Sequence, residues 1–547
     1  MDAGLERPAI TRWRVVAVLL FVAGAVARLA AYAQHRSLWY DEAALGLNVV
    51  ERGFVGLLAP LDNLQVAPPL FLWAERAIVL ALGPNEWVLR AIPLAAGIAT
   101  APMMWRFARR VIPLPVAILA VALVALSPSL VQQAAQAKPY AVDAFVTLLL
   151  CERAHACTRP EATRRTWLAL ALAGLLALAM STPAAFVLGG VVAYLTVTAR
   201  VARDRRMFAT ASATGLVWAT AFLGLLSTVF RAAASPTSDT GRFMQWYWAA
   251  NFLTPEPPGL RTKASAMTWA MLTGTFLGES TALPGATTIL ILAVVAGALG
   301  LLAQRRYALL ALLTVPTLAA CAASALRRYP IAERLMLFAA PLSAMLIASA
   351  ALIVRRLGDR RLAWAAGAMT AAVSVVASLG VAEQLGSTAG RQESRALVQA
   401  GSRIHAAGTP VWVSGGGEPA WRFYSGDRAP IRRTAAATEG GMGPGTMGRD
   451  VLIGSWYNGV PERIVTVVDD TATLSRPSPW SEREAARLRG LARPCALVFL
   501  SHIQPGEAGA LLTSASRLGG RVDWSRRAAG AELHHLCFDT AGSSVPQ

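Results

Sequence analysis

The chain has 547 residues, of which 55% are hydrophobic and 15% are charged, and its mean hydropathy is +0.46. These values exclude an ordinary soluble domain and predict an integral membrane protein. The formal net charge of +19 is not taken as a sign of nucleic-acid binding, because basic residues of membrane proteins gather in cytoplasmic loops. The five cysteines show no CxxC or zinc-ligand spacing, so no cofactor is expected; a divalent metal is possible, but no motif indicates one.

Apolar runs long enough to cross about 30 Å of hydrocarbon recur along the first 382 residues. The first run follows basic residues and lacks a small-residue cleavage site, so it predicts a retained anchor with a cytoplasmic N-terminus. Eleven spans are predicted, at residues 14–32, 86–107, 111–131, 140–158, 166–182, 184–200, 207–230, 284–303, 307–325, 333–354 and 362–382.

Arginine clusters lie at every second boundary of these spans. Because cytoplasmic loops are enriched in arginine and lysine, the alternation places these boundaries in the cytoplasm. The clusters are Arg7, Arg12 and Arg14; Arg106, Arg109 and Arg110; Arg153, Arg159, Arg164 and Arg165; Arg200, Arg203, Arg205 and Arg206; Arg305 and Arg306; and Arg355, Arg356, Arg360 and Arg361. Four polar segments then share the outer face, at residues 34–67, 132–140, 231–264 and 327–334.

The apolar segment 68–83 is only sixteen residues long and contains Glu75 and Arg76. Counting it as a twelfth span would break the arginine alternation, so we expect an interfacial or re-entrant helix within a first outer loop at 33–85. Residues 1–382 form the predicted transmembrane domain. Apart from Arg28, the predicted spans show no deep ionisable group, which favours an interfacial enzyme over a pathway through the membrane.

Beyond residue 382 the polarity becomes ordinary, and residues 383–547 predict a separate extracytoplasmic α/β domain. Strand-like runs at 410–414, 450–453 and 496–500 accompany a helix-like stretch at 481–491. The glycines at 415–417 lack the GxGxxG pattern, so we expect a plain turn and assign no ligand. Cys495 and Cys537 lie at the edges of two predicted strands, where they form either a disulfide or two buried thiols.

Two adjacent carboxylates, Asp41 and Glu42, follow aromatic residues in the first outer loop (LWYDEA, residues 38–43). Neighbouring acids do not share one face of a helix, so one can face a substrate while the other is held by a supporting group. The alternative is a solvated acid pair at a helix N-terminus.

Other polar groups are predicted at the same membrane depth. Of the 51 basic residues other than histidine only two are lysines, and one of them, Lys138, lies at this level, where a compact charge suits a phosphate. Its alternative role is that of a lysine reaching out from a helix end. Glu333 and Arg334 lie at the mouth of a span, where Glu333 could instead simply pair with Arg334 or Arg328.

The order of these motifs resembles the polyprenol-phosphate-dependent GT-C glycosyltransferases of the family-39 group. This group includes the aminoarabinose transferase of lipid A, the protein O-mannosyltransferases and the Rgt-type galacturonosyltransferases. The resemblance covers roughly residues 14–382 and rests on WYDEA at 39–43, APPL at 67–70, QAKPY at 136–140 and YPxxxR at 329–334. Gln136 and Lys138 stand where relatives usually have Glu and Arg, and Ala67 stands where some relatives have His or Lys.

The resemblance implies an enzyme that moves a sugar from a polyprenyl-phosphate donor to a glycan, lipid or protein acceptor, with inversion. It implies that Asp41 is the catalytic carboxylate, with Glu42 beside it, and that Lys138 binds the donor phosphate. We expect Arg334 to bind the same phosphate. We expect Gln65, Tyr140, Glu333 and Arg328 to orient substrate or support these groups. The expected location is the bacterial inner membrane, with the C-terminal domain in the periplasm.

Two other classes stay open. A transporter or flippase also needs charged groups at membrane level, but typically places them at the midplane of repeated halves, and the chain shows no internal repeat. A catalytically silent scaffold of the same fold in envelope glycan assembly is the second alternative.

Overall fold

The computed structural model describes residues 7–278, 284–387, 391–429, 431–433, 445–447, 450–453, 477–491, 493–503 and 506–539. The chain divides into two compact units. The first unit comprises residues 1–35, 53–60 and 66–387, and the second comprises residues 36–52, 61–65 and 388–547. Two segments of the predicted first outer loop therefore group with the C-terminal region.

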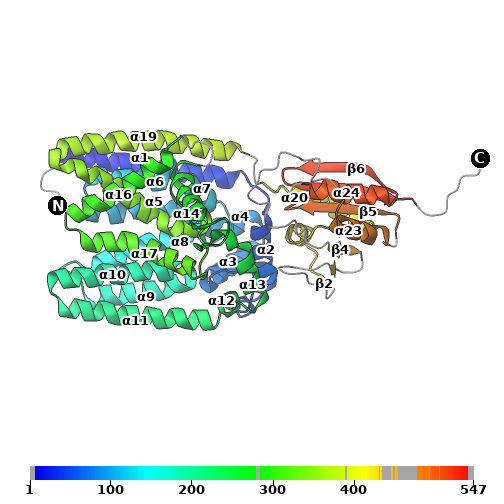
Figure 1. The fold of residues 1–547 in the computed structure, drawn as a ribbon, viewed down its shortest axis with the longest axis horizontal. Coiled ribbons are helices and arrows are strands. Elements are labelled where there is room, and N and C mark those ends of the chain that lie inside the picture. Colours follow the sequence, from blue (N-terminus) through cyan, green and yellow to red (C-terminus); the bar gives the residue numbers. More distant parts are fainter. Residues whose placement is uncertain are drawn as a thin grey trace, which may run out of the picture. The chain divides into compact units, whose positions relative to one another are not determined.

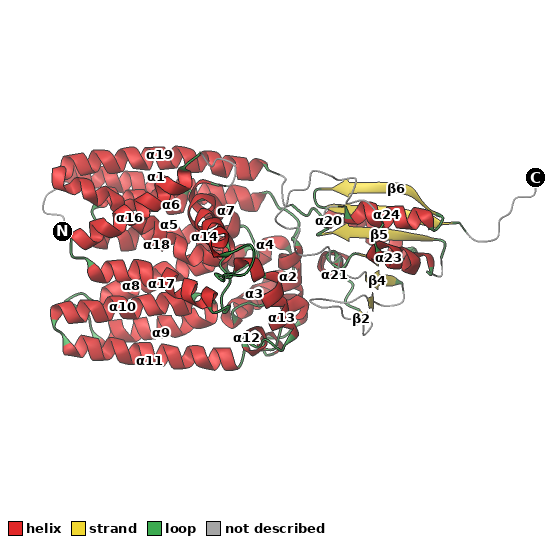
Figure 2. Ribbon diagram, viewed as in Figure 1, coloured by secondary structure: helices red, strands yellow, loops and turns green. Residues whose placement is uncertain are grey.

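The first unit is built of helices (Figures 1 and 2). Its α-helices are α1 (Arg7–Ala33), α3 (Pro69–Leu82), α4 (Glu86–Leu89), α5 (Ala91–Val111), α6 (Leu114–Ala125), α7 (Pro128–Ala134), α8 (Tyr140–Cys157), α9 (Arg164–Met180), α10 (Ala184–Ala202), α11 (Arg205–Ser227), α12 (Arg231–Ala234), α13 (Asp239–Tyr247), α14 (Leu260–Trp269), α15 (Thr275–Leu277), α16 (Ala286–Ala303), α17 (Tyr307–Ala325), α18 (Ala340–Ser349) and α19 (Asp359–Gly386). Its 3-10 helices are η1 (Gly56–Leu58), η3 (Ala249–Asn251), η5 (Glu333–Ala339) and η6 (Ala350–Leu357), and η4 (Ala270–Gly274) is a π-helix.

Seven helices of the described residues are long and apolar enough to cross a membrane, and an eighth span results if the bent pair α6 and α7 is counted as one. The multi-pass membrane fold is thereby confirmed, whereas the predicted number of eleven is not. Three predicted spans correspond to α5, α8 and α9. α9 has only 17 residues, and α8 carries Asp143, Glu152 and Arg153 within its 18 residues. The segment predicted to be interfacial or re-entrant forms the 14-residue α3, which is not among the candidate spans.

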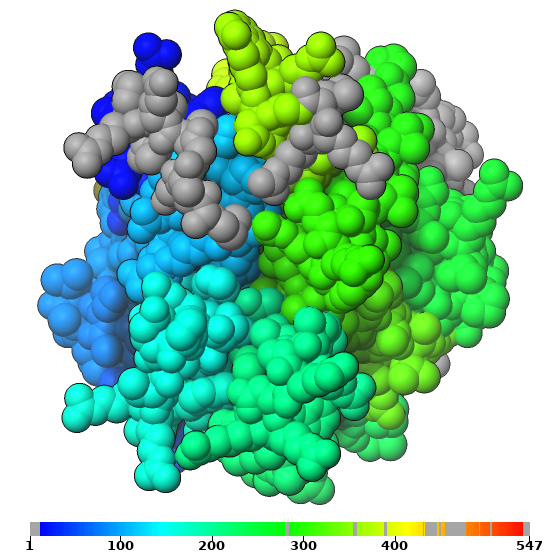
Figure 3. Space-filling view, turned by 90° about the vertical axis from the view of Figure 1, so that its left-hand side faces the viewer, coloured from blue at the N-terminus to red at the C-terminus, as the bar shows by residue number. Residues whose placement is uncertain are grey.

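The arginine-rich connections of the first unit lie together at one of its ends, which Figure 3 faces. Near this end Arg106 and Arg110 both contact the buried Glu152 of α8, and Arg306 donates a hydrogen bond to the carbonyl of Val111. The connections that the alternation assigned to one side of the membrane are therefore neighbours in the fold. The side of the membrane that this end faces stays a prediction.

Arg28 is 1% exposed in the middle of an apolar helix, and its partners are backbone carbonyls. Its guanidinium donates to the carbonyls of Ala125 at 2.7 Å and Val124 at 3.1 Å, at the C-terminal end of α6, and to that of Gly24 at 3.0 Å. The last carbonyls of a helix lack intrahelical donors and carry partial negative charge, so a cation there satisfies them. Arg28 is thus the partner that an open helix end inside an apolar bundle requires.

The chain breaks immediately after the carbonyls that Arg28 binds. Pro128 cannot donate to the preceding turn, Ser127 caps the new helix through its hydroxyl to the Leu130 amide at 3.2 Å, and α7 leaves α6 at 51°. The approach of α1 depends on Gly24, because a Cβ there would lie 2.8 Å from the Ala125 carbonyl oxygen. The break between α6 and α7 is therefore stabilised by contacts from α1 and by Ser127 and Pro128 at the break itself.

The described residues of the second unit form a seven-stranded sheet in the order β2-β3-β4-β1-β5-β7-β6. β1 runs parallel to β4 and β5, and the other pairs are antiparallel. The strands are β1 (Val411–Val413), β2 (Ile431–Arg433), β3 (Gly445–Met447), β4 (Val451–Ile453), β5 (Cys495–Ser501), β6 (Gly520–Ala528) and β7 (Ala531–Phe538). The helices are α2 (Tyr40–Glu51), η2 (Asp62–Leu64), α20 (Arg395–Ala406), α21 (Glu418–Ser425), α23 (Pro479–Arg489) and α24 (Glu507–Arg517).

Helices cover both faces of this sheet. Leu397 of α20 and Trp421 of α21 pack on one face with Phe499, whereas Leu488 of α23 and Leu511 of α24 pack on the other. The expected α/β architecture is confirmed, with the strands at 410–414, 450–453 and 496–500 in place. Figure 2 shows no strand outside this unit among the described residues.

Two smaller expectations for this unit also have outcomes. Cys495 and Cys537 form a disulfide between β5 and β7, so the first of the two alternatives holds. The triple glycine forms a turn into α21, in which the Gly417 amide donates to the Ser414 carbonyl at 2.9 Å. A Cβ on Gly416 would lie 2.8 Å from the His502 carbonyl oxygen, so close backbone packing explains the glycine.

We predict that Arg28→Leu destabilises the first unit by about 2–3 kcal/mol, because it leaves buried carbonyls of α6 without a donor. The measurement is the Tm of the full-length protein in detergent. Arg14→Leu is the matched control, since Arg14 lies on the same helix and is exposed. Equal melting temperatures for the two variants would contradict a structural role for the Arg28 contacts.

Candidate functional site

The residues singled out from the sequence belong to both units. Asp41, Glu42 and Gln65 are part of the second unit, and Lys138, Tyr140, Arg328, Glu333 and Arg334 are part of the first. The structure brings Asp41 and Gln65 into contact, and it gives several of the others partners that the sequence did not reveal.

The two adjacent acids have different environments at the start of α2. Glu42 is 1% exposed, and its carboxylate accepts a hydrogen bond from the Trp39 backbone amide at 3.3 Å. This is the reach of a third-position glutamate back to the helix N-terminus, so Glu42 fixes the first turn. Asp41 is only half-buried, and its Oδ1 accepts from the Gln65 amide nitrogen at 3.4 Å. Of the pair, Asp41 is the acid that the fold leaves accessible.

The C-terminal region supplies the groups that hold the first turn of α2. The Tyr40 amide donates to the Gln392 side-chain oxygen at 2.8 Å, and the Gln392 amide nitrogen lies 2.6 Å from Nδ1 of His502. The His502 ring in turn stacks on the Tyr40 ring, with centroids 4.9 Å apart. Asp41 is thus positioned by residues more than 350 positions away in the chain.

The stretch before α2 is anchored in the same way. The Leu38 amide donates to the Tyr424 hydroxyl at 2.6 Å, and the Ser37 hydroxyl donates to Glu393 at 3.0 Å. At the far end of α2, Glu51 pairs with Arg422 of α21 at 3.0 Å. The sequence does not reveal these contacts, because nothing in a local pattern links residues 37–51 to residues 392–424.

In the first unit, the QAKPY motif forms the turn between α7 and α8. The Lys138 amide donates to the Gln136 carbonyl at 2.8 Å, and the Lys138 side chain is 5% exposed. Tyr140 begins α8 and is half-buried. A cation as enclosed as Lys138 needs counter-charge or acceptors nearby, which separates it from a lysine reaching out to solvent.

One turn further along α8 lies an acid that the sequence analysis overlooked. Asp143 is 3% exposed, and its Oδ1 has no hydrogen-bond partner among the described residues. Glu75 of α3 is 2% exposed, and neither of its carboxylate oxygens has a hydrogen-bond partner there. The predicted spans therefore contain a buried acid, Asp143, besides Arg28, whereas Glu75 lies in the segment that was not counted as a span. The sequence feature that could have indicated this acid is an aspartate three residues after the KPY triplet. It was not considered because residues 140–158 were interpreted only as an apolar span.

Glu333 reaches the broken span rather than only its arginine neighbours. Its carboxylate accepts a hydrogen bond from the Ser129 hydroxyl at the first turn of α7, and Ser129 also lies 3.2 Å from the Gly274 carbonyl. Ser127 donates to the Thr275 carbonyl at 2.6 Å. The start of α7 is therefore tied to η4, α15 and η5.

The late motif also contacts the segment that precedes α14. The Arg334 guanidinium lies over the Trp248 ring, 5.4 Å from its centroid, and Arg328 is exposed and donates to the Ala234 carbonyl at 3.3 Å. The Tyr329 hydroxyl donates to the Leu335 carbonyl at 2.7 Å. Burial raises the pKa of Tyr329 well above its usual range, so this hydroxyl stays a neutral donor at physiological pH.

The chain's other lysine, Lys263, is enclosed on α14 itself. Lys263 is 2% exposed, and its ammonium donates to the Thr254 hydroxyl at 3.0 Å and to the Ala249 carbonyl at 3.3 Å. The rarity of lysine thus singles out two positions rather than Lys138 alone. Nearby, the partly exposed Trp246 and Tyr247 pack around Phe243.

Comparison with solved structures gives the fold a family context. ArnT from Cupriavidus metallidurans in the apo state matches with a TM-score of 0.55 at 14% identity, covering 96% of this chain and 98% of that one. The same protein bound to undecaprenyl phosphate matches with a TM-score of 0.54 at 15% identity, covering 97% and 99%. The oligosaccharyltransferase AglB from Archaeoglobus fulgidus, in complex with an inhibitory peptide and a dolichol-phosphate, matches with a TM-score of 0.52 at 11% identity, covering 95% and 74%.

The chain has the GT-C glycosyltransferase fold. Residues 66–225 also match the model of the dolichyl-phosphate-mannose-protein mannosyltransferase family, so the resemblance expected from the motifs is confirmed. No curated protein sequence matches the chain significantly. Within this GT-C protein the family match includes Lys138, Tyr140 and the overlooked Asp143, whereas Asp41 and Glu42 precede it.

We predict that Glu42→Ala loosens the first turn of α2 by about 1 kcal/mol, the usual cost of a lost N-terminal cap. Hydrogen exchange of the α2 amides in the GT-C protein should then be about five-fold faster. Glu42→Gln keeps an acceptor oxygen at the same place and is the matched control. Unchanged exchange in Glu42→Ala would contradict the capping role.

Proposed function

We propose that this GT-C protein transfers a sugar from a polyprenyl-phosphate donor to an acceptor hydroxyl, with inversion at the anomeric carbon. The observation that carries the proposal is the match of nearly the whole chain to ArnT, a protein whose solved complex contains undecaprenyl phosphate. The family match of residues 66–225 and the prenyl phosphate in the AglB complex support the same donor class. A lipid-linked donor arrives already activated, so no nucleotide site is required.

Asp41 is the proposed general base. Its partial exposure lets it meet an acceptor, while Gln65 and the capped first turn of α2 hold its carboxylate in place. The acceptor hydroxyl gives its proton to Asp41 as its oxygen forms the new glycosidic bond. The bond from the anomeric carbon to the phosphate oxygen breaks, and the sugar has oxocarbenium character in between.

Lys138 and Arg334 are the proposed partners of the leaving phosphate. Polyprenyl phosphate gains negative charge as it departs, and cationic side chains stabilise that charge in an enclosed site. The low exposure of Lys138 and the restraint of Arg334 by Trp248 support this assignment, because both limit reorganisation of the charges during the reaction. Tyr140, Glu333 and Arg328 are proposed to orient the substrate or these groups.

The proposed location follows from the donor chemistry. The isoprenoid tail dissolves in the bilayer while the phosphate and sugar emerge at its surface, so we place the reaction at the outer face of the bacterial inner membrane. The arginine-rich end then faces the cytoplasm, as does the N-terminus, and the C-terminal region is periplasmic. The exposed aromatics Trp246 and Tyr247 are suited to stacking on a sugar of the acceptor.

We predict that Asp41→Asn lowers transfer by about 1,000-fold or more, because the variant keeps the side-chain shape but cannot accept a proton. The measurement is transfer of radiolabel from polyprenyl-phosphate sugars into membrane extracts at matched expression. Glu161→Gln is the control variant, since Glu161 is a surface acid with a 73% exposed side chain.

The assay also separates the catalytic proposal from its alternatives. A folded Asp41→Asn protein that transfers as fast as wild type would contradict the role of Asp41. Wild-type membranes that transfer from none of the lipid-linked donors would contradict the enzyme and favour a silent scaffold or a transporter.

A further inference from the structure

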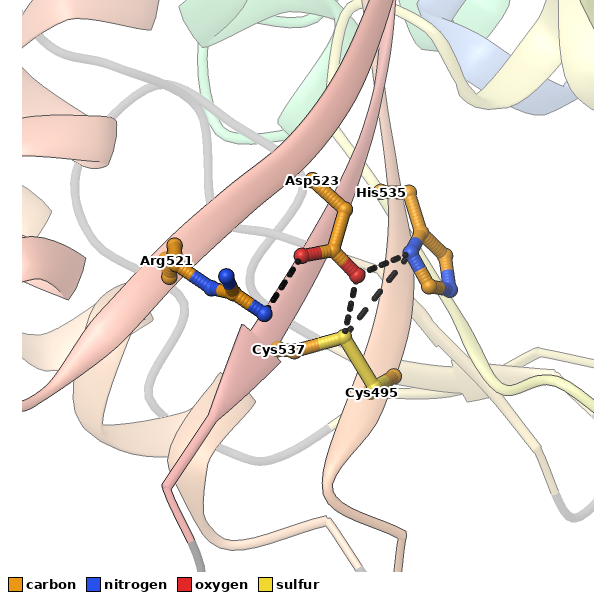
Figure 4. The surroundings of a disulfide bond; sticks show 5 residues. All are labelled: Cys495, Arg521, Asp523, His535 and Cys537. Carbon is orange, nitrogen blue, oxygen red and sulfur yellow. Dashed lines mark hydrogen bonds and ion pairs between the residues drawn. A yellow bond between two sulfur atoms is a disulfide. The ribbon is translucent and has the colours of Figure 1, made fainter.

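Four side chains with metal-binding atoms meet at one end of the sheet in the second unit. They are Cys495 of β5, Asp523 of β6, and His535 and Cys537 of β7 (Figure 4). Among the described residues, the sulfur atoms of Cys495 and Cys537 and a ring nitrogen of His535 lie within 4.8 Å of one another. No motif indicated this group, because the sequence brings only His535 and Cys537 near each other.

Strand register explains why the four side chains share a face. His535 and Cys537 are two residues apart on β7, so they point to the same side, and Cys495 lies directly opposite Cys537 in the antiparallel pair. Asp523 is the extra residue of a β-bulge, since Val522 pairs with Leu536 while Trp524 pairs with His535. A bulge re-aims a side chain, and here it brings the Asp523 carboxylate to the cysteines and histidine.

The distances among these atoms resemble the edges of a metal tetrahedron. Oδ2 of Asp523 lies 3.2 Å from Nδ1 of His535 and 3.1 Å from Sγ of Cys537, and the last two atoms are 3.8 Å apart. Zinc bonds of about 2.0–2.3 Å to nitrogen, oxygen and sulfur imply ligand separations of roughly 3.4–3.6 Å in a tetrahedral site. Three of the four ligand atoms are therefore already within about half an ångström of that geometry.

Supporting groups hold two of these side chains in the required orientation. Arg521 binds the other carboxylate oxygen of Asp523 at 3.1 Å, which leaves Oδ2 directed at the cluster. Trp524 stacks on the His535 ring with an interplanar angle of 4°, which fixes the plane of the imidazole. Metal sites typically orient their ligands through contacts of this kind.

The disulfide leaves the Asp523 carboxylate without a hydrogen-bond donor from the cysteines. A bonded sulfur has no hydrogen to donate, yet the Asp523 carboxylate oxygen lies against Sγ of Cys537. Two electron-rich atoms in contact favour a proton or a cation between them. Reduction of the bond would provide thiols that can donate to this carboxylate, or thiolates that can share a metal ion with it.

We propose that the reduced form of this cluster binds one zinc ion through Cys495, Asp523, His535 and Cys537. A dithiol exchanges with the Cys495–Cys537 bond, so the dithiol is oxidised to a disulfide and the two cysteines are reduced to thiols. One zinc ion then displaces two thiol protons and forms bonds to two thiolates, the imidazole and the carboxylate. Two soft sulfurs with one nitrogen and one oxygen favour zinc over calcium or magnesium. The ion replaces the disulfide as the link between β5 and β7.

The test uses the full-length protein in detergent, with Cys151→Ala, Cys157→Ala and Cys321→Ala to remove the other thiols. The protein is reduced with a phosphine, which becomes a phosphine oxide while water supplies the protons and oxygen. It is then titrated with Co²⁺ as a spectroscopic substitute for Zn²⁺. We expect one equivalent of Co²⁺, a thiolate-to-cobalt charge-transfer band and the visible bands of a tetrahedral ion. The oxidised protein should show none of these signals.

Variants separate the proposed ligands from general effects. His535→Ala should weaken Zn²⁺ binding by about 100-fold or more, and Arg521→Ala, which loses only a supporting contact, by about 10- to 100-fold. His405→Ala is the control, since His405 lies on α20 and bonds the Thr409 carbonyl. Equal affinity of His535→Ala and His405→Ala, or the absence of a charge-transfer band in the reduced protein, would overturn the proposal.

Loss of folding on reduction is tested separately. If the reduced second unit becomes sensitive to protease, zinc should restore its resistance in the parent protein and not in Cys495→Ser/Cys537→Ser. Failure of zinc to restore resistance would overturn the proposal. The glycosyltransferase assay does not enter this test, so a negative result there leaves the metal proposal intact.

Discussion

The contact between Arg28 and the end of α6 is the constraint on which the rest of the first unit depends. A guanidinium inside an apolar bundle is costly unless its donors are satisfied, and the carbonyls of a broken helix are equally costly unless they find donors. Here the two terminal nitrogens of Arg28 donate to the Ala125 and Val124 carbonyls at 2.7 and 3.1 Å, so both needs are met in large part, while Nε of Arg28 has no hydrogen-bond partner among the described residues. Because the span can end at Ala125, α7 can start at a new angle, and the turn with Lys138 follows from it.

The second unit solves a different positioning problem. The proposed general base lies on a short helix of 12 residues, so its position depends on the first turn of that helix. Glu42 caps that turn from within, while Gln392, His502 and Tyr424 hold it from the C-terminal part of the chain. The C-terminal region is thus part of the support for Asp41, which explains why the loop and the sheet form one compact unit.

Much of the fold could be predicted, because the determining signals are local. Hydropathy located the bundle, arginine alternation located one of its ends, and short β-type runs located three strands of the sheet. The number of spans could not be predicted, since α8 and α9 fall short in apolarity or length although they pack as part of the bundle. Contacts between distant parts of the chain could not be predicted either. The bond from the Trp39 amide to Glu42 is local and follows from helix capping, whereas the bond from the Tyr40 amide to Gln392 joins residues far apart in the sequence. Asp143 and the bulged Asp523 were missed for the same reason, because their surroundings exist only after folding.

The proposed donor is a sugar linked to polyprenyl phosphate. Purified protein in lipid vesicles is given either a short-chain prenyl-phosphate sugar or a nucleotide carrying the same sugar. The measurement is the consumption of each donor, together with the release of prenyl phosphate. Only the prenyl-linked donors should be consumed, and the released lipid should carry a single phosphate. Consumption of the nucleotide sugars while the prenyl-linked donors stay unchanged would contradict a polyprenyl-phosphate donor.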